Sequence, residues 1–251
     1  MTSDAGREYH FEDFTEDAYG SMLDVAKRRY AFEPFGTEAG GAHLLWRHDV
    51  DFSVHRALAL AEIEAERELR STYFLSFHSE LYNLLEASIT ERARRIVELG
   101  HWIGLHFDAG FHGLEPGSEQ LERKLELERR MLEELLETPI GALSFHNPEA
   151  TGMTAADSDS LAGMVNAYGR GIRERYSYIS DSNGYWRHRR LPELLEGGGE
   201  ERLHVLTHPE WWQPEPMSPR ERLERCISGR AEGTRRWYDE MLARWGRENV
   251  G

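Results

Sequence analysis

Short apolar runs alternate with longer, helix-forming segments from about residue 42 onward. The apolar runs predict about six strands, at residues 43–49, 71–77, 101–106, 140–145, 176–181 and 203–207. The longer segments predict helices, at residues 53–63, 90–99, 118–137 and 218–247. Repeated strand–helix units favour a parallel sheet that is covered or surrounded by helices.

This order of elements predicts the α/β class. About six to seven parallel strands can form a distorted (β/α) barrel that is nearly closed, and a doubly wound open sheet is the alternative. No long linker divides the chain, so we expect one domain over residues 1–251. Residues 1–41 form an N-terminal extension with a helix at 15–29, and a final helix covers about 218–247. Polar residues 151–160 and the glycines at 197–199 predict surface loops.

The charge balance excludes several classes of partner. Lys and Arg total 30 and Asp and Glu total 45, which gives a formal charge of −15. Such a chain repels nucleic-acid phosphates and anionic lipids. We also expect no membrane insertion, because no apolar run approaches the ~20 residues that cross a bilayer. The start of the chain lacks a signal-peptide pattern, so we expect a cytoplasmic protein.

The familiar sequence motifs of several enzyme classes are also missing. Cys226 is the single cysteine, which excludes an intrachain disulfide and a multi-cysteine metal site. There is no phosphate-binding Gly-x-x-x-x-Gly-Lys loop and no dinucleotide-binding Gly-x-Gly-x-x-Gly turn. A Gly-x-Ser-x-Gly nucleophile elbow is absent as well.

Polar residues instead gather where the predicted strands end. The segments concerned are Arg47 to Asp51, His106 to Asp108, His146 to Pro148, Asp181 to Ser182 and His208 to Trp212. Parallel α/β folds place their ligands at this edge of the sheet. Strand-end Asp and His often serve only as helix caps or surface residues, but several such ends together favour a site.

One Asp and two His form a suitable ligand set for a catalytic divalent metal. The simplest assembly takes Asp51, His106 and His146 as ligands. Asp49 lies on the same side of the strand as Asp51, because strand side chains alternate, and can act as general base. His208 comes from a separate strand and can act as general acid.

The strand ends, in this order, resemble those of the polysaccharide deacetylase family, also called the NodB-homology or carbohydrate esterase 4 family. The resemblance covers about residues 42–212. It rests on segments 47–51 (Arg-His-Asp-Val-Asp), 72–74 (Thr-Tyr-Phe), 100–106 (Gly-His-Trp-Ile-Gly-Leu-His), 144–148 (Ser-Phe-His-Asn-Pro), 178–181 (Tyr-Ile-Ser-Asp) and 206–209 (Leu-Thr-His-Pro). It implies a NodB-like distorted barrel, an Asp-His-His metal site and hydrolysis of an N-acetyl group. Carried over to this chain, the base is Asp49, a metal ligand is Asp51 and the acid is His208.

The chain departs from the family pattern in three places. Val50 separates two Asp residues that are usually adjacent, Gly110 stands where a second metal-binding His is usual, and His146 stands where Arg is usual. His146 can replace the ligand that Gly110 does not supply. Asp108 and His112 are the rival third ligands. The chain most resembles a divergent Arg-His-Asp-Val-Asp branch of the family.

The resulting hypothesis is a metal-dependent hydrolase of a C–N amide bond, which deacetylates a sugar or a sugar-containing biosynthetic intermediate. The expected cofactor is one divalent metal ion, Zn²⁺ first, with Fe²⁺, Co²⁺ or Ni²⁺ as alternatives. The expected partner is a small-molecule or sugar substrate. The candidate substrate contacts are Arg47, Tyr73, Asp108, Asp181 and Trp211. The alternatives are a hydrolase of a formyl or ureide group and a non-catalytic sugar-binding protein.

Overall fold

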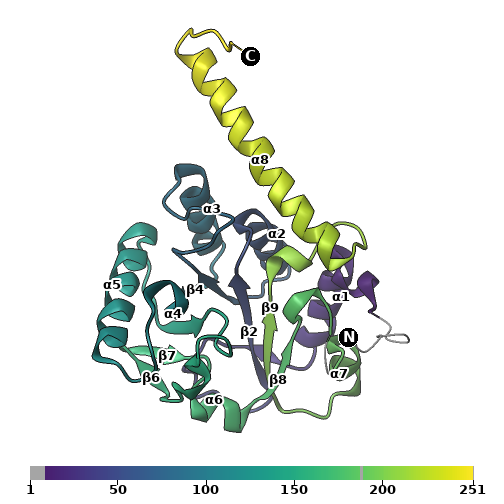
Figure 1. Ribbon diagram of the computed structural model, residues 1–251. Coiled ribbons are helices and arrows are strands. Elements are labelled where there is room, and N and C mark those ends of the chain that lie inside the picture. Colours follow the sequence, from purple (N-terminus) through teal and green to yellow (C-terminus); the bar gives the residue numbers. More distant parts are fainter. Residues whose placement is uncertain (1–8, 187–188, 251) are drawn as a thin grey trace, which may run out of the picture.

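One curved, mainly parallel sheet forms the centre of the molecule in the computed structural model, which describes residues 9–186 and 189–250 (Figure 1). Its strand order is β6-β7-β5-β4-β3-β2-β9-β8, and β1 pairs with β2 beside this path. The strands are β1 Ala31–Phe32, β2 His43–Val50, β3 Thr72–Leu75, β4 Trp102–Phe107, β5 Ala142–Phe145, β6 Ser160–Leu161, β7 Met164–Asn166, β8 Ser177–Ser180 and β9 Arg202–Thr207. Only the pairing of β6 with β7 is antiparallel in the described residues.

The prediction of a distorted α/β barrel is confirmed, in an incomplete form. The six predicted strands correspond to β2, β3, β4, β5, β8 and β9. Within the described ranges, the two end strands β6 and β8 do not pair with each other, so the barrel stays open. The short strands β1, β6 and β7 were not predicted, because two or three residues are too few to show an alternating pattern.

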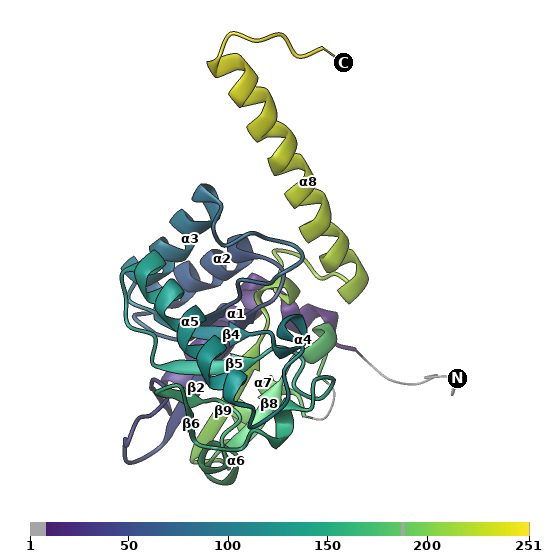
Figure 2. The ribbon, with the colours of Figure 1, turned by 60° about the vertical axis from the view of Figure 1, so that its left-hand side comes forward.

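Helices cover the outer face of the curved sheet (Figure 2). The α-helices in the described residues are α1 Glu16–Lys27, α2 Val54–Ala65, α3 Ala87–Glu98, α4 Ala109–His112, α5 Glu119–Leu136, α6 Arg170–Arg175, α7 Leu191–Gly197 and α8 Pro219–Arg244, of which α8 does not lie on the sheet. The side chains of Ser53, Ser118 and Ser218 cap α2, α5 and α8, respectively. Helix α3 begins at Ala87, three residues before its predicted start, and Thr90 lies inside it. None of the helices in the described ranges is both long and apolar enough to cross a bilayer.

The two faces of the sheet differ in chemistry. Outward-facing residues such as Trp46, Leu105 and Phe145 belong to two large apolar clusters under the helices. Residues of the concave face alternate with them and include Arg47, Asp49, His106, Ser144 and His204. A smaller apolar cluster, which includes Leu45 and Phe74, fills the lower part of this face. The polar residues therefore collect towards the carboxyl ends of the strands, inside the curve.

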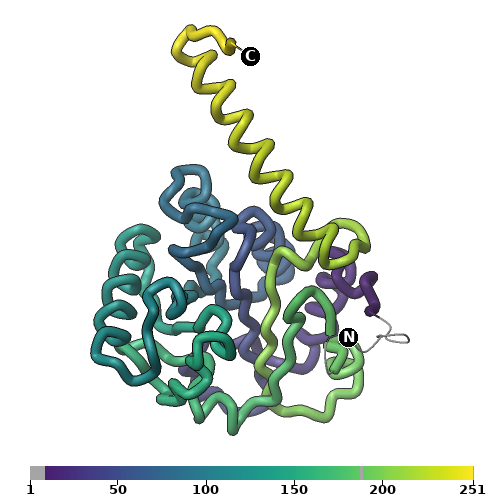
Figure 3. The backbone as a smooth tube through the Cα atoms, in the orientation of Figure 1, coloured from purple at the N-terminus to yellow at the C-terminus, as the bar shows by residue number. Residues whose placement is uncertain are grey.

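Helix α8 extends away from the rest of the molecule (Figure 3). Its first turn is anchored by a Ser218–Glu221 capping box and by the buried Arg222, which donates to Gly184 O at 2.9 Å. Arg230 forms an ion pair with Glu86 at 2.7 Å, near the middle of the helix. Beyond that contact, Trp237, Tyr238 and Trp245 are exposed.

A buried polar network supports the central strand from behind. Glu64 of α2 is fully buried and accepts hydrogen bonds from Tyr19, from Ser71 Oγ at 2.9 Å and from Tyr73 Oη at 2.7 Å. Its Oε1 also lies 2.8 Å from His48 Nε2 of β2. Burial disfavours the Glu64 charge, but His48 and these hydrogen bonds outweigh burial and lower the pKa of Glu64 to about 2.

Replacing this carboxylate should destabilise the fold. We expect Glu64→Gln to lower the free energy of unfolding by about 3 kcal/mol, because an amide group presents donors to neighbours that already donate. Urea denaturation measures this loss. The matched control is Glu62→Gln on the exposed side of α2, which should change the free energy by less than about 0.5 kcal/mol. Equal stability of the two variants would contradict the structural role of Glu64.

Candidate active site

The register of four adjacent strands brings the site residues onto one face. Asp49 of β2 pairs with Phe74 of β3, which pairs with Gly104 of β4. His106 is two residues beyond Gly104 and pairs with Ser144 of β5. Asp49, His106 and Ser144 therefore all point into the concave side of the sheet.

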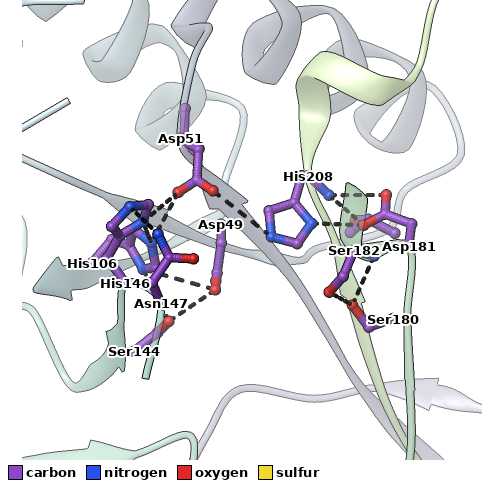
Figure 4. A network of polar contacts seen from close by, with 12 residues as sticks. Asp49, Asp51, His106, Ser144, His146, Asn147, Ser180, Asp181, Ser182 and His208 are labelled. Atoms are coloured by element: carbon purple, nitrogen blue, oxygen red, sulfur yellow. Dashed lines mark hydrogen bonds and ion pairs between the residues drawn. The ribbon is translucent and has the colours of Figure 1, made fainter. Parts of the chain in front are cut away.

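Three potential metal ligands converge at the edge of this face (Figure 4). Asp51 Oδ1 lies 3.0 Å from His106 Nε2 and 3.2 Å from His146 Nδ1. The two histidine nitrogens are 3.2 Å apart. Ligand atoms of a tetrahedral zinc ion lie about 3.3 Å from one another. The donor set and its spacing thus fit a divalent metal.

The charge state of Asp51 agrees with a ligand role. Burial disfavours its carboxylate, but hydrogen bonds from His106 and His146 and the nearby His208 outweigh this and hold the pKa of Asp51 well below its usual range. Asp51 is therefore ionised at neutral pH. The pKa of His146 is raised, chiefly by its hydrogen bond to Asp51.

A hydrogen-bonded chain connects one ligand to Asp49. Ser144 Oγ donates to Asp49 Oδ2 at 2.9 Å and lies 3.0 Å from His106 Nδ1. Such a partner fixes the orientation of the imidazole so that Nε2 faces the metal position. Arg47 Nη2 donates to the same Asp49 oxygen at 3.1 Å. Asp49 Oδ2 is thus held by Arg47 and Ser144, whereas Oδ1 is buried and has no hydrogen-bond partner in the described part of the chain.

His208 approaches Asp51 from the opposite side, out of the segment after β9 (Figure 4). Its Nε2 lies 3.9 Å from Asp51 Oδ2, and its Nδ1 lies 2.6 Å from Asp181 Oδ1. Asp181 is fully buried and also accepts hydrogen bonds from the backbone of His208 and from Trp212 Nε1. Burial opposes a positive charge on His208, but Asp181 and Asp51 outweigh it and raise the pKa of His208 to about 10. His208 is therefore protonated at neutral pH and can donate a proton as a general acid.

A pH profile tests the link between Asp181 and His208. Removing the carboxylate in Asp181→Asn should lower the pKa of His208, so that the protonated ring is lost at lower pH. We expect the alkaline limb of the rate profile to move down by about 1–3 pH units. The control is Asp157→Asn, a half-exposed carboxylate that pairs with Arg170 and not with His208, and it should leave the limb in place. An unchanged limb in Asp181→Asn would show that His208 is not the acid.

The structure separates the predicted site residues into two groups. It brings together Asp49, Asp51, His106, His146 and His208, with Arg47 and Asp181 directly behind them. Asp181 contacts His208, so its position is that of an orienting residue rather than a substrate contact. Asp108 caps the short helix α4 and is partly exposed next to the site.

Tyr73 lies on the other face of the sheet, whereas Trp211 packs on Phe52, the residue after Asp51. Tyr73 is fully buried on the outer face of the sheet and donates to Glu64. It is therefore not retained as a substrate contact, because neighbouring residues of a strand point to opposite faces. Trp211 is 9% exposed and packs edge-on against Phe52.

The structure also shows that neither His112 nor the Gly110 position supplies the third ligand. His112 contacts Glu128 at 2.5 Å and belongs to a different cluster. A Cβ atom added at Gly110 would lie 3.1 Å from Asp108 Oδ1, on the exposed side of α4. His146 is the histidine that joins Asp51 and His106.

Four further residues of functional interest are not predicted from the sequence. Ser144 shares a strand face with His146, and this spacing of two was a usable signal. Asn147 lies beside the same ring, with its side-chain amide nitrogen 2.8 Å from His146 Nε2. Tyr168 Oη accepts a hydrogen bond from Arg47 at 2.8 Å. Glu210 is fully buried near His208, and burial raises its pKa well above the usual range. No periodic pattern marks Tyr168 or Glu210.

Comparison with known proteins gives distant structural likenesses. No family model matches the sequence, and no curated protein matches it. A carbohydrate esterase 4 family pseudoenzyme from Bacillus anthracis is 14% identical with a TM-score of 0.43, over 76% of this chain and 60% of that one. The catalytic domain of peptidoglycan N-acetylglucosamine deacetylase from Eubacterium rectale is 11% identical with a TM-score of 0.47, over 80% and 89% of the two chains.

A family 4 carbohydrate esterase from Streptomyces lividans is 13% identical with a TM-score of 0.42, over 76% of this chain and 90% of that one. These solved structures belong to the family that the strand-end motifs resemble. The chain spans less than two thirds of the length of the pseudoenzyme, at 60%. The TM-scores lie below 0.5, so the functional argument depends on the geometry of the site itself.

Proposed function

We propose that the chain is a metal-dependent hydrolase of a C–N amide bond and that it removes the acetyl group from an N-acetylated sugar or sugar-containing intermediate. One observation carries the proposal: the Asp49 carboxylate and the charged His208 flank the same three-ligand cluster. Asp49 lies behind His106, with Asp49 Oδ2 3.7 Å from His106 Nδ1. His208 lies on the other side of Asp51, 3.9 Å away.

The residues divide the reaction between them. Asp51, His106 and His146 would hold the metal, which when bound polarises an amide carbonyl and lowers the pKa of water. Asp49 Oδ1, which has no hydrogen-bond partner among the described residues, would accept the proton of the attacking water, while Arg47 and Ser144 hold Oδ2. His208 donates a proton to the departing nitrogen, and Asp181 keeps the ring charged and oriented. Water adds to the acyl carbon, the C–N bond breaks, and the products are acetate and an amine.

Acetate release from a panel of N-acetylated sugars tests the proposal. The panel includes N-acetylglucosamine, its oligomers and a nucleotide-linked form, and formyl and ureide compounds serve as alternative substrates. We expect acetate release by the zinc-loaded protein and none after chelation. Hydrolysis of only the formyl or ureide compounds would show that the substrate carries one of these groups and not an acetyl group. Sugar binding without turnover, unchanged by chelation, would instead favour a non-catalytic binding protein.

A further inference from the structure

A second group of metal-ligating side chains lies on the outer side of the sheet. It consists of His78 in the segment after β3, His112 at the end of α4 and Glu128 of α5. Glu128 Oε1 lies 2.9 Å from His78 Nε2 and 2.5 Å from His112 Nε2. The ligand atoms of all three residues lie within 4.8 Å of one another.

This cluster is separate from the proposed active site. His106 of β4 points to the concave face, and the next residue, Phe107, points to the outer apolar cluster. The ring of His112 stacks on Phe107 with centroids 5.2 Å apart. The two groups of ligands therefore lie on opposite sides of β4.

The polar atoms of the second cluster are incompletely satisfied by the protein. The Glu128 side chain is 4% exposed, and both histidines contact only its Oε1. Its other oxygen, Oε2, is buried and has no hydrogen-bond partner in residues 9–186 and 189–250. An unpaired buried carboxylate oxygen costs stability unless a cation or donor compensates it. A cation between the three side chains would supply that compensation.

We propose that His78, His112 and Glu128 form a second divalent-cation site, distinct from the active site, with the nitrogen–oxygen ligand set that suits Zn²⁺. The histidine side chains are 16% and 12% exposed, which gives an ion access from solvent. A cation here ties together the segment after β3, helix α4 and helix α5. Its role is structural, because none of the base and acid residues of the active site belongs to this cluster.

Hydrogen bonds connect the segment that carries His78 to the backbone of the active-site strand β2. The segment that carries His78 holds the end of β2 through Ser79 Oγ, which donates to Asp51 O at 2.6 Å. Tyr82 Oη of the same segment donates to Val50 O at 2.9 Å. A cation that fixes His78 therefore helps to fix the backbone of Asp51.

Zinc stoichiometry tests this inference without an activity assay. The full chain is loaded with Zn²⁺, desalted and measured by mass spectrometry. We expect about two equivalents in the native protein and about one in Glu128→Gln, with the same loss in His112→Gln. The control Glu126→Gln changes an exposed residue of the same helix and should keep about two. Circular dichroism confirms that each variant is folded.

Zinc binding to the Asp51→Asn variant tests the second site independently of the proposed active site. Asp51→Asn should lose only the active-site ion, and added Zn²⁺ should still raise its melting temperature. The double variant Asp51→Asn/Glu128→Gln should bind none and show no such rise. Unchanged stoichiometry in both Glu128→Gln and His112→Gln would overturn the second site. Loss confined to those two variants, with none in Asp51→Asn, would uphold it and reject the proposed active site.

Discussion

Replacing Asp49 with asparagine is expected to lower acetate release by about 10²–10⁴-fold while the active-site metal stays bound. Asparagine has nearly the same shape and can still contact Ser144 and Arg47, but its amide cannot accept a proton from water. Turnover at saturating substrate and zinc content, measured on the same preparation, test the prediction.

Two controls isolate the proton transfer at Asp49. Asp239→Asn changes an exposed carboxylate on α8, away from the site, and should keep most of the turnover. Ser144→Ala breaks the chain between Asp49 and His106 but leaves the Asp49 carboxylate, so it should reduce turnover less than Asp49→Asn does. If Asp49→Asn retains native turnover, the base assignment is wrong.

Loss of His208 should depend on the leaving group. His208→Asn is expected to slow amide hydrolysis by about 10²–10⁴-fold, because an amine departs poorly without a proton. A 4-nitrophenyl ester releases an anion that needs no proton, so its hydrolysis should fall by less than about tenfold. The ratio of the two rates measures the contribution of the acid.

The variant His55→Asn provides the comparison for His208. His55 lies at the start of α2 and is not part of the ligand cluster, so both substrates should be hydrolysed normally by this variant. Equal losses on amide and ester in His208→Asn would assign His208 to substrate binding or to folding rather than to proton donation.

The pattern of the sequence was sufficient for the main sheet. The strand predicted at residues 43–49 is β2 His43–Val50, and every one of its side chains is buried. A capping serine precedes each of α2, α5 and α8, and these serines mark where the three helices begin. The pattern could not predict whether the barrel closes, since closure depends on the pairing of the end strands β6 and β8 and not on any one segment.

The site could be predicted where strand alternation applies. Asp49, Asp51 and His106 follow from their positions at strand ends, and the parallel register brings them together. Tyr73 shows the limit of this reasoning: it belongs to a strand of the site, but its register turns it towards Glu64 on the outer face. The contact of Asp181 with His208 joins two segments that only the folded chain brings together, so the sequence alone does not predict that Asp181 orients His208.

The metal content of His146→Ala tests the Asp51–His106–His146 metal site, because His146 is the ligand that compensates for Gly110. The measurement is made in the Glu128→Gln background, so that zinc at the other cluster does not contribute. We expect about one equivalent of zinc before the His146 substitution and none after it. Retention of the metal without His146, or absence of metal from both proteins after loading with Zn²⁺, would contradict the Asp51–His106–His146 site.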